Sequence, residues 1–318
     1  MATDHRHRQP PLADPHHAKR PIAKESLFEV GQLATKVSQF RDVLQDPDID
    51  ARLLAREFYD AIIGPVAESL KQAKARTIMF SLDSQLRYLP IAALYDGQKW
   101  LAQDYTVTLF NDAKAGLAKS PVGNWRVAAL GVTKGHTVTV GGGVLPGTMT
   151  LDEGFTSEAL AEVLETGYPV VHLASHFHFD SKNPEQSSLL LGDGSGLPLS
   201  RIETEDFKFK SVDLLALSAC QTARGGTDAT GKEIEGFRAL AQKRGAKAVL
   251  ATLWPVFDES TGLLMPNFYR LYADEGKKLS IAEFLRQAQL QMIDNQIAGK
   301  DYQHPFYWGP FVLMGDWR

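Results

Sequence analysis

In the second half of the chain, short and almost continuous apolar runs alternate with segments whose apolar residues recur every three or four positions. Runs of the first kind are typical of strands buried on both faces of a parallel sheet, and segments of the second kind are typical of amphipathic helices. The pattern therefore predicts the α/β class, with a mostly parallel sheet flanked by helices. The expected strands are Val170–Ala174, Leu189–Leu191, Val212–Ala219 and Ala246–Leu253, and the expected helices are Glu233–Lys243 and Glu259–Tyr272.

The first half of the chain divides into a tail, a helical segment and shorter strands. Residues 1–24 contain hardly any bulky apolar residue, so we expect a flexible tail there. Residues 25–75 are expected to form N-terminal helices, because apolar residues recur at helical spacing in Leu27–Leu44 and in Ala51–Lys74, with Pro47 between them. Further on, the expected elements are strands at Thr77–Leu82, Tyr105–Phe110 and Trp125–Val132, a long loop at Gly135–Met149, and a helix at Thr156–Leu164 with Thr156 or Ser157 as N-cap.

Composition excludes several classes of protein. The 318 residues are 44% hydrophobic and 23% charged, as in an ordinary globular protein. The formal charge of −4 provides no basic footprint for nucleic acid, so no nucleic-acid partner is predicted. No apolar stretch approaches the roughly 20 residues that a bilayer span needs, and no signal-peptide core is present; we expect no membrane partner and a cytoplasmic location. One cysteine cannot form an internal disulfide, which agrees with a reducing compartment.

Cys220 and His176 each stand at the carboxyl end of an expected strand, the edge where ligands gather in such a sheet. If the two strands lie side by side, the thiol meets the imidazole, and a cysteine nucleophile needs such a base. Either residue by itself has a structural explanation, as a small buried hydrophobe or as a partner of a backbone group. Their order resembles that of caspases, in which a catalytic His lies about 50 residues before the Cys; here the separation is 220 − 176 = 44 residues. The match is partial, because Ser218-Ala219-Cys220-Gln221 stands in place of the caspase Gln-Ala-Cys pattern.

Two other histidines compete for the role of base. Positions 172, 174 and 176 share one face of a strand, so periodicity does not choose between His172 and His176, and His178 lies just beyond. We do not expect these histidines and Cys220 to form a zinc site, because metal clusters bring more ligands at tight loop spacing. The Gly-rich segments at 141–143 and 224–226 match no phosphate-binding loop. The sequence therefore predicts neither a metal nor a cofactor.

Several motifs occur together and in a characteristic order. They are His172–Phe177, Leu217–Thr222, Gly231–Gly236, Leu253–Asp258 and His304–Asp316, preceded by the block Asp83–Gly97. This set resembles the CHAT domain, a caspase-like peptidase module related to separase, over roughly residues 50–318. The resemblance implies a caspase-hemoglobinase-like fold for residues 76–318, with an N-terminal half at 76–150 and a catalytic half at 151–318.

The resemblance also implies site residues. Cys220 would be the nucleophile and His176 the general base and then the general acid, because the family's base is the second His of its His-x-x-x-His segment. His172 would then be a supporting or packing residue. The backbone amides of Cys220 and Phe177 would stabilise the oxyanion. Many relatives have Gly at the position of Phe177.

Asp258 matches the place where separase-like relatives carry an acidic residue that selects a basic side chain before the cut bond. A carboxylate that pairs with Arg or Lys suits such a pocket. Asp258 is equally well explained as the N-cap of the following helix, and the two roles are compatible. Asp193 is a weaker candidate, because Gly192-Asp193-Gly194 is first of all a turn.

Taken together, the sequence predicts a cysteine endopeptidase that cleaves a protein or peptide substrate after a basic residue. Relatives are often fused to helical repeats, so control by a regulatory protein or a helical-repeat domain is expected, although no 34-residue repeat occurs in this chain. The alternative is a catalytically silent caspase-like scaffold or protein-interaction module.

Overall fold

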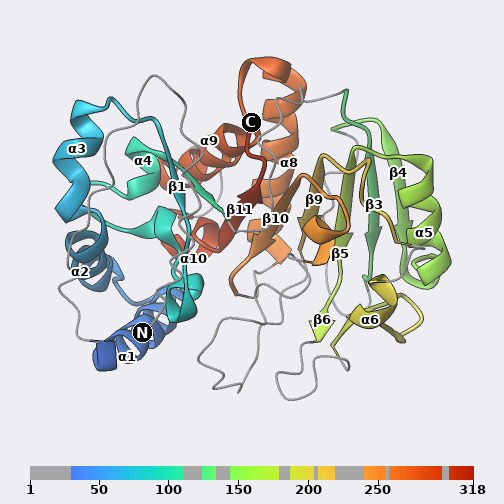
Figure 1. Cartoon of the computed structure of the whole chain (residues 1–318), viewed down its shortest axis with the longest axis horizontal. Coiled ribbons are helices and arrows are strands. Elements are labelled where there is room, and N and C mark those ends of the chain that lie inside the picture. Colours follow the sequence, from blue (N-terminus) through green and yellow to red (C-terminus); the bar gives the residue numbers. More distant parts are fainter. Residues whose placement is uncertain are drawn as a thin grey trace, which may run out of the picture.

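The centre of the fold is a sheet in the order β1-β2-β11-β10-β9-β5-β3-β4 (Figure 1). The computed structural model describes residues 30–110, 124–133, 144–178, 187–203, 207–218, 240–254, 258–295 and 301–318. The strands of the main sheet are β1 (Thr77–Phe80), β2 (Thr106–Leu109), β3 (Val127–Gly131), β4 (Gly147–Leu151), β5 (Val170–Ala174), β9 (Leu214–Leu217), β10 (Ala248–Thr252) and β11 (Phe311–Gly315). A small antiparallel sheet contains β6 (Phe177–His178), β7 (Ser188–Leu190) and β8 (Gly196–Pro198).

The main sheet consists of two parallel halves that run in opposite directions. Strand β11 is antiparallel to β10, with Thr252 opposite Phe311, and parallel to β2. Strands β10, β9, β5, β3 and β4 all run parallel to one another. In the middle, β5 pairs with β9 so that Leu173 lies opposite Leu217. The carboxyl ends of β5 and β9 therefore lie side by side at one edge of the sheet, and β6 extends beyond that edge (Figure 1).

Helices flank the sheet, as the apolar pattern predicts. They are α1 (Val30–Leu44), α2 (Arg52–Ile62), α3 (Ala67–Gln72), α4 (Leu101–Asp104), α5 (Ser157–Thr166), α6 (Leu199–Ile202), α8 (Asp258–Glu275), α9 (Ile281–Ile293) and α10 (Pro305–Trp308). Short 3-10 turns are η1 (Gly64–Val66), η2 (Ser84–Tyr88), η3 (Ile91–Ala93), η4 (Asp152–Gly154) and η6 (Gly276–Lys278). Within the described part of the chain, no helix combines the length and the apolar character that crossing a bilayer requires.

Side chains of β5 alternate between two hydrophobic clusters. Val170 belongs to a cluster that includes α1, α2, α8 and α9, whereas Val171 belongs to a second cluster that includes α5 and α6. Both faces of the strand are therefore buried, which explains its continuous apolar sequence. The predicted α/β class, with a mostly parallel sheet flanked by helices, is confirmed.

Local signals set the bounds of α5. The side chain of Thr156, one of the two N-caps that the sequence suggested, accepts a hydrogen bond of 3.1 Å from the Ala159 amide. At the other end Gly167 adopts φ +78°, a left-handed conformation that glycine takes at little cost. The helix thus begins where Thr156 accepts a hydrogen bond from a terminal amide, and it ends where Gly167 lets the backbone leave the helical conformation.

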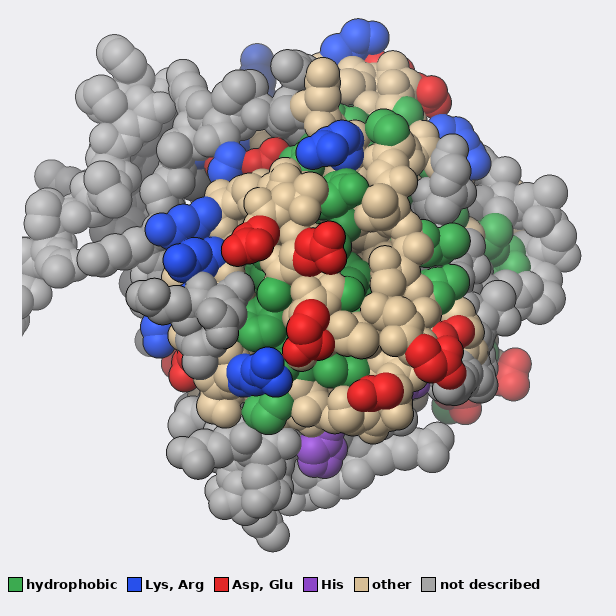
Figure 2. Space-filling view, turned by 90° about the vertical axis from the view of Figure 1, so that its right-hand side faces the viewer, with side chains coloured by type: hydrophobic (Ala, Val, Ile, Leu, Met, Phe, Trp, Pro, Cys, Tyr) green, Lys and Arg blue, Asp and Glu red, His purple; other side chains and the backbone are tan. Residues whose placement is uncertain are grey.

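Figure 2 shows the face of the molecule that carries α5 and the edge strand β4, with acidic side chains spread across it. Glu158, Glu162 and Glu165 of α5 are exposed. On β4, Met149 is also exposed, and Figure 2 shows hydrophobic side chains between the charged ones on this face. Charges next to an edge strand discourage pairing with other chains.

The N-terminal helical segment differs from the expectation in one respect. The sequence predicted one helix over Ala51–Lys74, but α2 ends at Ile62 and α3 begins at Ala67. Gly64 and Pro65 lie between them in η1, where Pro65 has no amide hydrogen for a helical bond and restricts the residue before it.

Several strands depart from the expected pattern. Strand β4 starts at Gly147, inside the segment predicted as a long loop, and Leu189 lies in the small sheet rather than in the main one. Strands β6, β8 and β11 and helices α4, α6, α9 and α10 are not among the elements that the sequence predicts. The expected tail at 1–24 and most of the expected helix Glu233–Lys243 lie outside the described residues.

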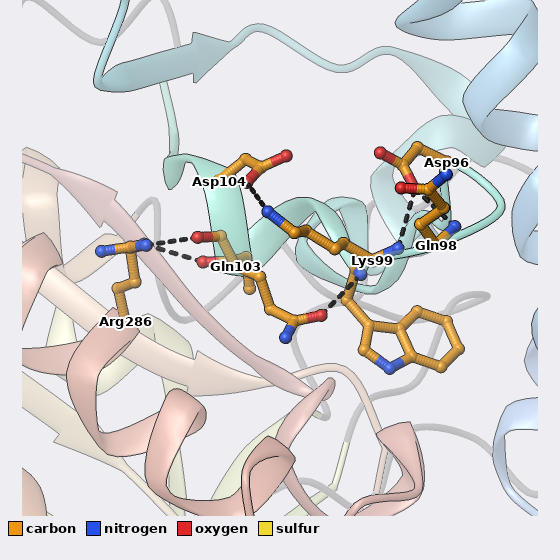
Figure 3. A network of polar contacts seen from close by, with 8 residues as sticks. Asp96, Gln98, Lys99, Gln103, Asp104 and Arg286 are labelled. Carbon is orange, nitrogen blue, oxygen red and sulfur yellow. Dashed lines mark hydrogen bonds and ion pairs between the residues drawn. The ribbon is translucent and has the colours of Figure 1, made fainter.

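A polar network connects α9 to the N-terminal half of the domain (Figure 3). The guanidinium of Arg286 on α9 donates to the Ala102 carbonyl at 2.7 Å and to the Gln103 carbonyl at 2.6 Å. These carbonyls belong to the last turn of α4, where a helix leaves its acceptors without internal partners. Arg286 also pairs with Glu283 at 3.0 Å, and its side chain is only 18% exposed. Arg286 therefore caps the C-terminal end of α4 and connects α4 to α9.

We expect Arg286→Ala to lower the free energy of unfolding by about 2–4 kcal/mol, because it leaves two half-buried carbonyls and one carboxylate without their cationic partner. Urea unfolding measures this loss. Arg270, which is exposed on α8 and contacts Asn267 on the same helix, provides the matched control. Arg270→Ala should change the stability by less than about 0.5 kcal/mol. Equal effects of the two substitutions would contradict the role of the network.

Candidate functional site

The candidate site lies where β5 and β9 end. His176 is half-buried and follows the last residue of β5 by two positions. Cys220 lies outside the described residues, which stop at Ser218 just after β9. The two strands pair with an offset of 217 − 173 = 44 residues, from Leu173 opposite Leu217. The same offset, 220 − 176 = 44, separates the two candidate catalytic residues in the sequence.

Hydrogen bonds hold the backbone around His176 on two sides. The Leu190 amide donates to the His176 carbonyl at 2.8 Å, and the Ser175 hydroxyl donates to the Leu190 carbonyl at 2.6 Å. On the opposite side, the Val132 amide donates to the Ala174 carbonyl at 2.9 Å. The segment that carries His176 is thereby fixed between β3 and the small sheet.

Phe177, whose amide the sequence suggested as an oxyanion donor, begins β6. It pairs with Leu189 of β7 in an antiparallel ladder, and the hydrogen bond next to this pair runs from the Leu190 amide to the His176 carbonyl. Phe177 and Leu189 therefore form a non-hydrogen-bonded pair. In such a pair the amide of each residue points away from the partner strand, so the Phe177 amide points away from β7.

His172 is buried completely, four residues before His176. Its Nε2 atom lies 2.8 Å from the Ser218 hydroxyl oxygen, and its Nδ1 atom lies 3.0 Å from the Tyr269 hydroxyl of α8. The residues in register with His172 on the neighbouring strands are Ala129 and Ala216. Small side chains on both sides leave room for the imidazole between the sheet and α8.

Burial decides the charge state of this buried pair. It lowers the pKa of His172 to about 4, because a protonated ring would lose its hydration, and it raises the pKa of Tyr269 well above the usual value. Both groups are neutral at physiological pH. His172 has no exposed surface, so its ring does not reach the solvent. His178, the other competing histidine, is exposed in β6.

The two candidate acidic residues lie on different elements. Asp258 is the first residue of α8, and its side chain lies outside the described part of the structure. Asp193 is exposed between β7 and β8, where its carboxylate accepts a hydrogen bond of 2.8 Å from the Ser195 amide. Hydrogen bonds from Ser195 lower the pKa of Asp193. Asp193 therefore has the turn role that Gly-Asp-Gly predicts.

Sequence reasoning missed Tyr269 and Ser218 as members of the site's surroundings. Tyr269 lies within an apolar helical stripe, and Ser218 lies in a motif that drew attention to its cysteine. A buried tyrosine normally finds a hydrogen-bond partner, which was the available signal. The partner itself, 97 positions earlier in the chain, was not visible in the sequence.

Comparisons with known proteins agree with this architecture. The model of the CHAT domain matches residues 52–131 and 131–316. A search of curated proteins found no match. Among solved structures, the Arg-specific cysteine proteinase gingipain R aligns with a TM-score of 0.53 and 10% identity, over 90% of this chain and 74% of its own. The pro- and mature domains of RgpB from Porphyromonas gingivalis align with a TM-score of 0.50 and 9% identity, over 89% of this chain and 76% of theirs.

A chain of the Saccharomyces cerevisiae separase–securin complex aligns with a TM-score of 0.44 and 13% identity. The alignment covers 72% of the present chain and 14% of that chain, so the present chain spans only a small part of that protein. Together with the sheet order, the gingipain alignments confirm the expected caspase-like fold.

The burial of His172 predicts that the folded protein loses stability at acid pH. Between pH 6.5 and about 4 the unfolded chain binds a proton at this residue and the folded chain does not, so folding stability falls as the pH falls through this window. The loss amounts to about 3 kcal/mol at the lower end, from a difference of 6.5 − 4 = 2.5 in pKa. Above pH 6.5 this contribution is absent.

Urea unfolding at several pH values measures this effect. In His172→Gln, we expect the stability to depend less steeply on pH between 6.5 and 4 than in the wild type. His178→Gln removes an exposed histidine and should leave the slope unchanged. Parallel pH profiles of the wild type and His172→Gln would show that burial does not keep His172 neutral.

Proposed function

Because the chain belongs to the CHAT domain family, we propose that it is a cysteine endopeptidase in which Cys220 attacks the peptide bond and His176 is the general base. The observation that carries the proposal is the register of β5 and β9. Their pairing offset of 44 residues equals the separation of the two residues in the sequence. Continued by three residues beyond Leu173 and Leu217, the same register pairs His176 with Cys220.

The spacing of a sheet supports proton transfer between these residues. Adjacent strands lie roughly 4.8 Å apart, and residues in register on the same face are direct neighbours. Even-numbered residues of both strands, such as Ala174 and Ala216, belong to the cluster on the α8 side of the sheet. His176 and Cys220 continue these two even-numbered series. In the proposed enzyme both side chains therefore meet on one face.

The proposed reaction is acyl transfer to the thiol. His176 takes the proton from Cys220, and the thiolate attacks the carbonyl carbon of the peptide. The amides of Cys220 and Phe177 stabilise the resulting oxyanion, and the direction of the Phe177 amide away from β7 supports this role. The C–N bond breaks as His176 returns the proton to the leaving amine. Water, deprotonated by His176, then hydrolyses the thioester and releases the free enzyme.

We propose Asp258 as the residue that selects a basic side chain before the cut bond. Strand β10 is the neighbour of β9, and α8 begins at Asp258 a few residues after β10 ends. Asp258 thus follows a strand whose carboxyl end lies at the same edge as those of β5 and β9. Asp193 remains the weaker candidate, since its carboxylate already accepts a hydrogen bond from Ser195. Control by a regulatory protein or a helical-repeat domain is part of the proposal.

The nucleophile and the base are tested with fluorogenic peptides that carry Arg, Lys or Asp before the reporter group. We expect hydrolysis by the wild type, none above background by Cys220→Ala, and a decrease in kcat/KM of about 10²–10⁴-fold in His176→Ala. His178→Ala is the matched control and should retain the wild-type rate. Hydrolysis that survives Cys220→Ala would refute the proposed nucleophile.

A companion measurement does not depend on an activating partner. The chain has a single cysteine, so iodoacetamide labels Cys220 and no other thiol. A thiol activated by His176 reacts faster at neutral pH than in His176→Ala, because the thiolate is the reactive form. Equal labelling rates, together with an absence of hydrolysis, would favour the silent scaffold.

The specificity residue is tested by Asp258→Asn. The substitution removes the charge and retains the shape, so kcat/KM for Arg and Lys peptides should fall by about 10–100-fold, the equivalent of one charge-assisted hydrogen bond. Peptides with a neutral residue at this position should be cleaved as before. Asp193→Asn is the matched control. An unchanged preference in Asp258→Asn would place the selecting group elsewhere.

A further inference from the structure

A continuous hydrogen-bonded chain of side chains runs from α8 to the end of β9. Tyr269 contacts His172 at 3.0 Å, and His172 contacts Ser218 at 2.8 Å. Tyr269 and His172 are fully buried, whereas Ser218 is half-buried. Burying two polar side chains completely and a third in part is costly unless their hydrogen bonds are made, so the hydrogen bonds within this chain stabilise its arrangement.

The direction of the hydrogen bonds follows from the burial of Tyr269. Among the described residues, the Tyr269 hydroxyl has His172 Nδ1 as its hydrogen-bond partner. A buried hydroxyl must give its proton to an acceptor, so Tyr269 donates and Nδ1 accepts. Neutral His172 then carries its proton on Nε2 and donates it to the Ser218 oxygen. Ser218 keeps its own hydroxyl proton for a further acceptor.

Ser218 occupies a defined place between the two histidines. Its amide donates to the Leu173 carbonyl at 2.9 Å, which continues the ladder between β5 and β9. In the register of that ladder, the position opposite Ser218 is Ala174. His172 and His176 are then the diagonal neighbours on the same face, two residues before and after Ala174. Ser218 is also two residues before Cys220.

We propose that Tyr269, His172 and Ser218 form a positioning relay that holds the end of β9 and the side chains of the proposed dyad in their reactive arrangement. This inference rests on the proposed function, because it assigns the relay to the Cys220 and His176 pair. None of the three residues is catalytic. Tyr269 acts on His172 and His172 acts on Ser218, and Ser218 lies next to the proposed dyad. Tyr269 sets the tautomer of His172, and His172 orients the hydroxyl of Ser218.

The relay itself is tested by ¹⁵N NMR of the imidazole rings in the whole protein. In the wild type, we expect His172 to have a protonated Nε2 and a hydrogen-bonded, unprotonated Nδ1. Tyr269→Phe should shift the Nδ1 resonance towards that of an unbonded acceptor. Tyr272→Phe is the matched control, because Tyr272 lies on the same helix and its hydroxyl accepts from the Trp125 amide instead. A proton on Nδ1 in the wild type would overturn the proposed direction.

The positioning role is tested by the rate at which iodoacetamide labels Cys220 at neutral pH. We expect Tyr269→Phe and Ser218→Ala each to slow labelling by about fivefold, the effect of losing one neutral hydrogen bond. Tyr272→Phe should label at the wild-type rate. Because Ser218→Ala removes only a hydroxyl at a half-buried position, it tests the relay even where a change at Tyr269 disturbs the core.

Outcomes for the relay and for the proposed function are separable. If His176→Ala slows labelling but Tyr269→Phe and Ser218→Ala do not, the relay proposal is overturned and the proposed function stands. If His176→Ala leaves labelling unchanged, the positioning role is overturned, and the proposed function fails with it where no peptide is hydrolysed. Slowing in all three variants, with a normal rate in Tyr272→Phe, supports both.

Discussion

The hydrogen-bonded pairing of β5 with β9 is the interaction on which the rest of the structure depends. Its register places the ends of both strands at one edge of the sheet and brings Ser218 within hydrogen-bond distance of His172. Side chains alternate between the two faces, so a slip of one residue would turn the whole strand over. His172 would then face α5 instead of Tyr269, and Val171 would exchange one hydrophobic cluster for the other. Both clusters therefore resist such a slip.

Several elements provide the space and the hydrogen-bond partners for the polar chain of Tyr269, His172 and Ser218. Ala129 and Ala216 supply space beside His172, and α8 supplies the tyrosine hydroxyl that accompanies it. Since the imidazole is neutral, its two nitrogens are satisfied by one donor and one acceptor, with no charge left in the core. A core that contains such a chain permits few alternative packings, because any shift breaks a buried hydrogen bond. The segment that carries His176 therefore follows a strand that two side-chain hydrogen bonds connect to α8 and β9.

The elements that precede β3 contribute no candidate catalytic residue, yet they share the core that supports the site. One hydrophobic cluster extends from Phe40 of α1 to Val170 of β5 and Leu313 of β11. The antiparallel junction between β10 and β11 joins the two halves of the sheet, and Arg286 links α4 to α9, which packs against β2 and β11. Loss of this packing would also destabilise β5 and β9, because the two halves bury one another's apolar surface.

The sequence by itself determined the α/β class, the bounds of β5, the two candidate N-caps of α5 and the expectation that a thiol and an imidazole end neighbouring strands. These are local properties, since apolar periodicity and capping residues act within a few positions. Only the tertiary structure decided that His172 is buried and neutral, that β7 leaves the main sheet and that β11 runs against β10. Positions 172 and 176 share a face in any strand, so their difference depends on what packs against each. For His172 that partner is Tyr269, and contacts between residues so far apart in the chain leave no local pattern.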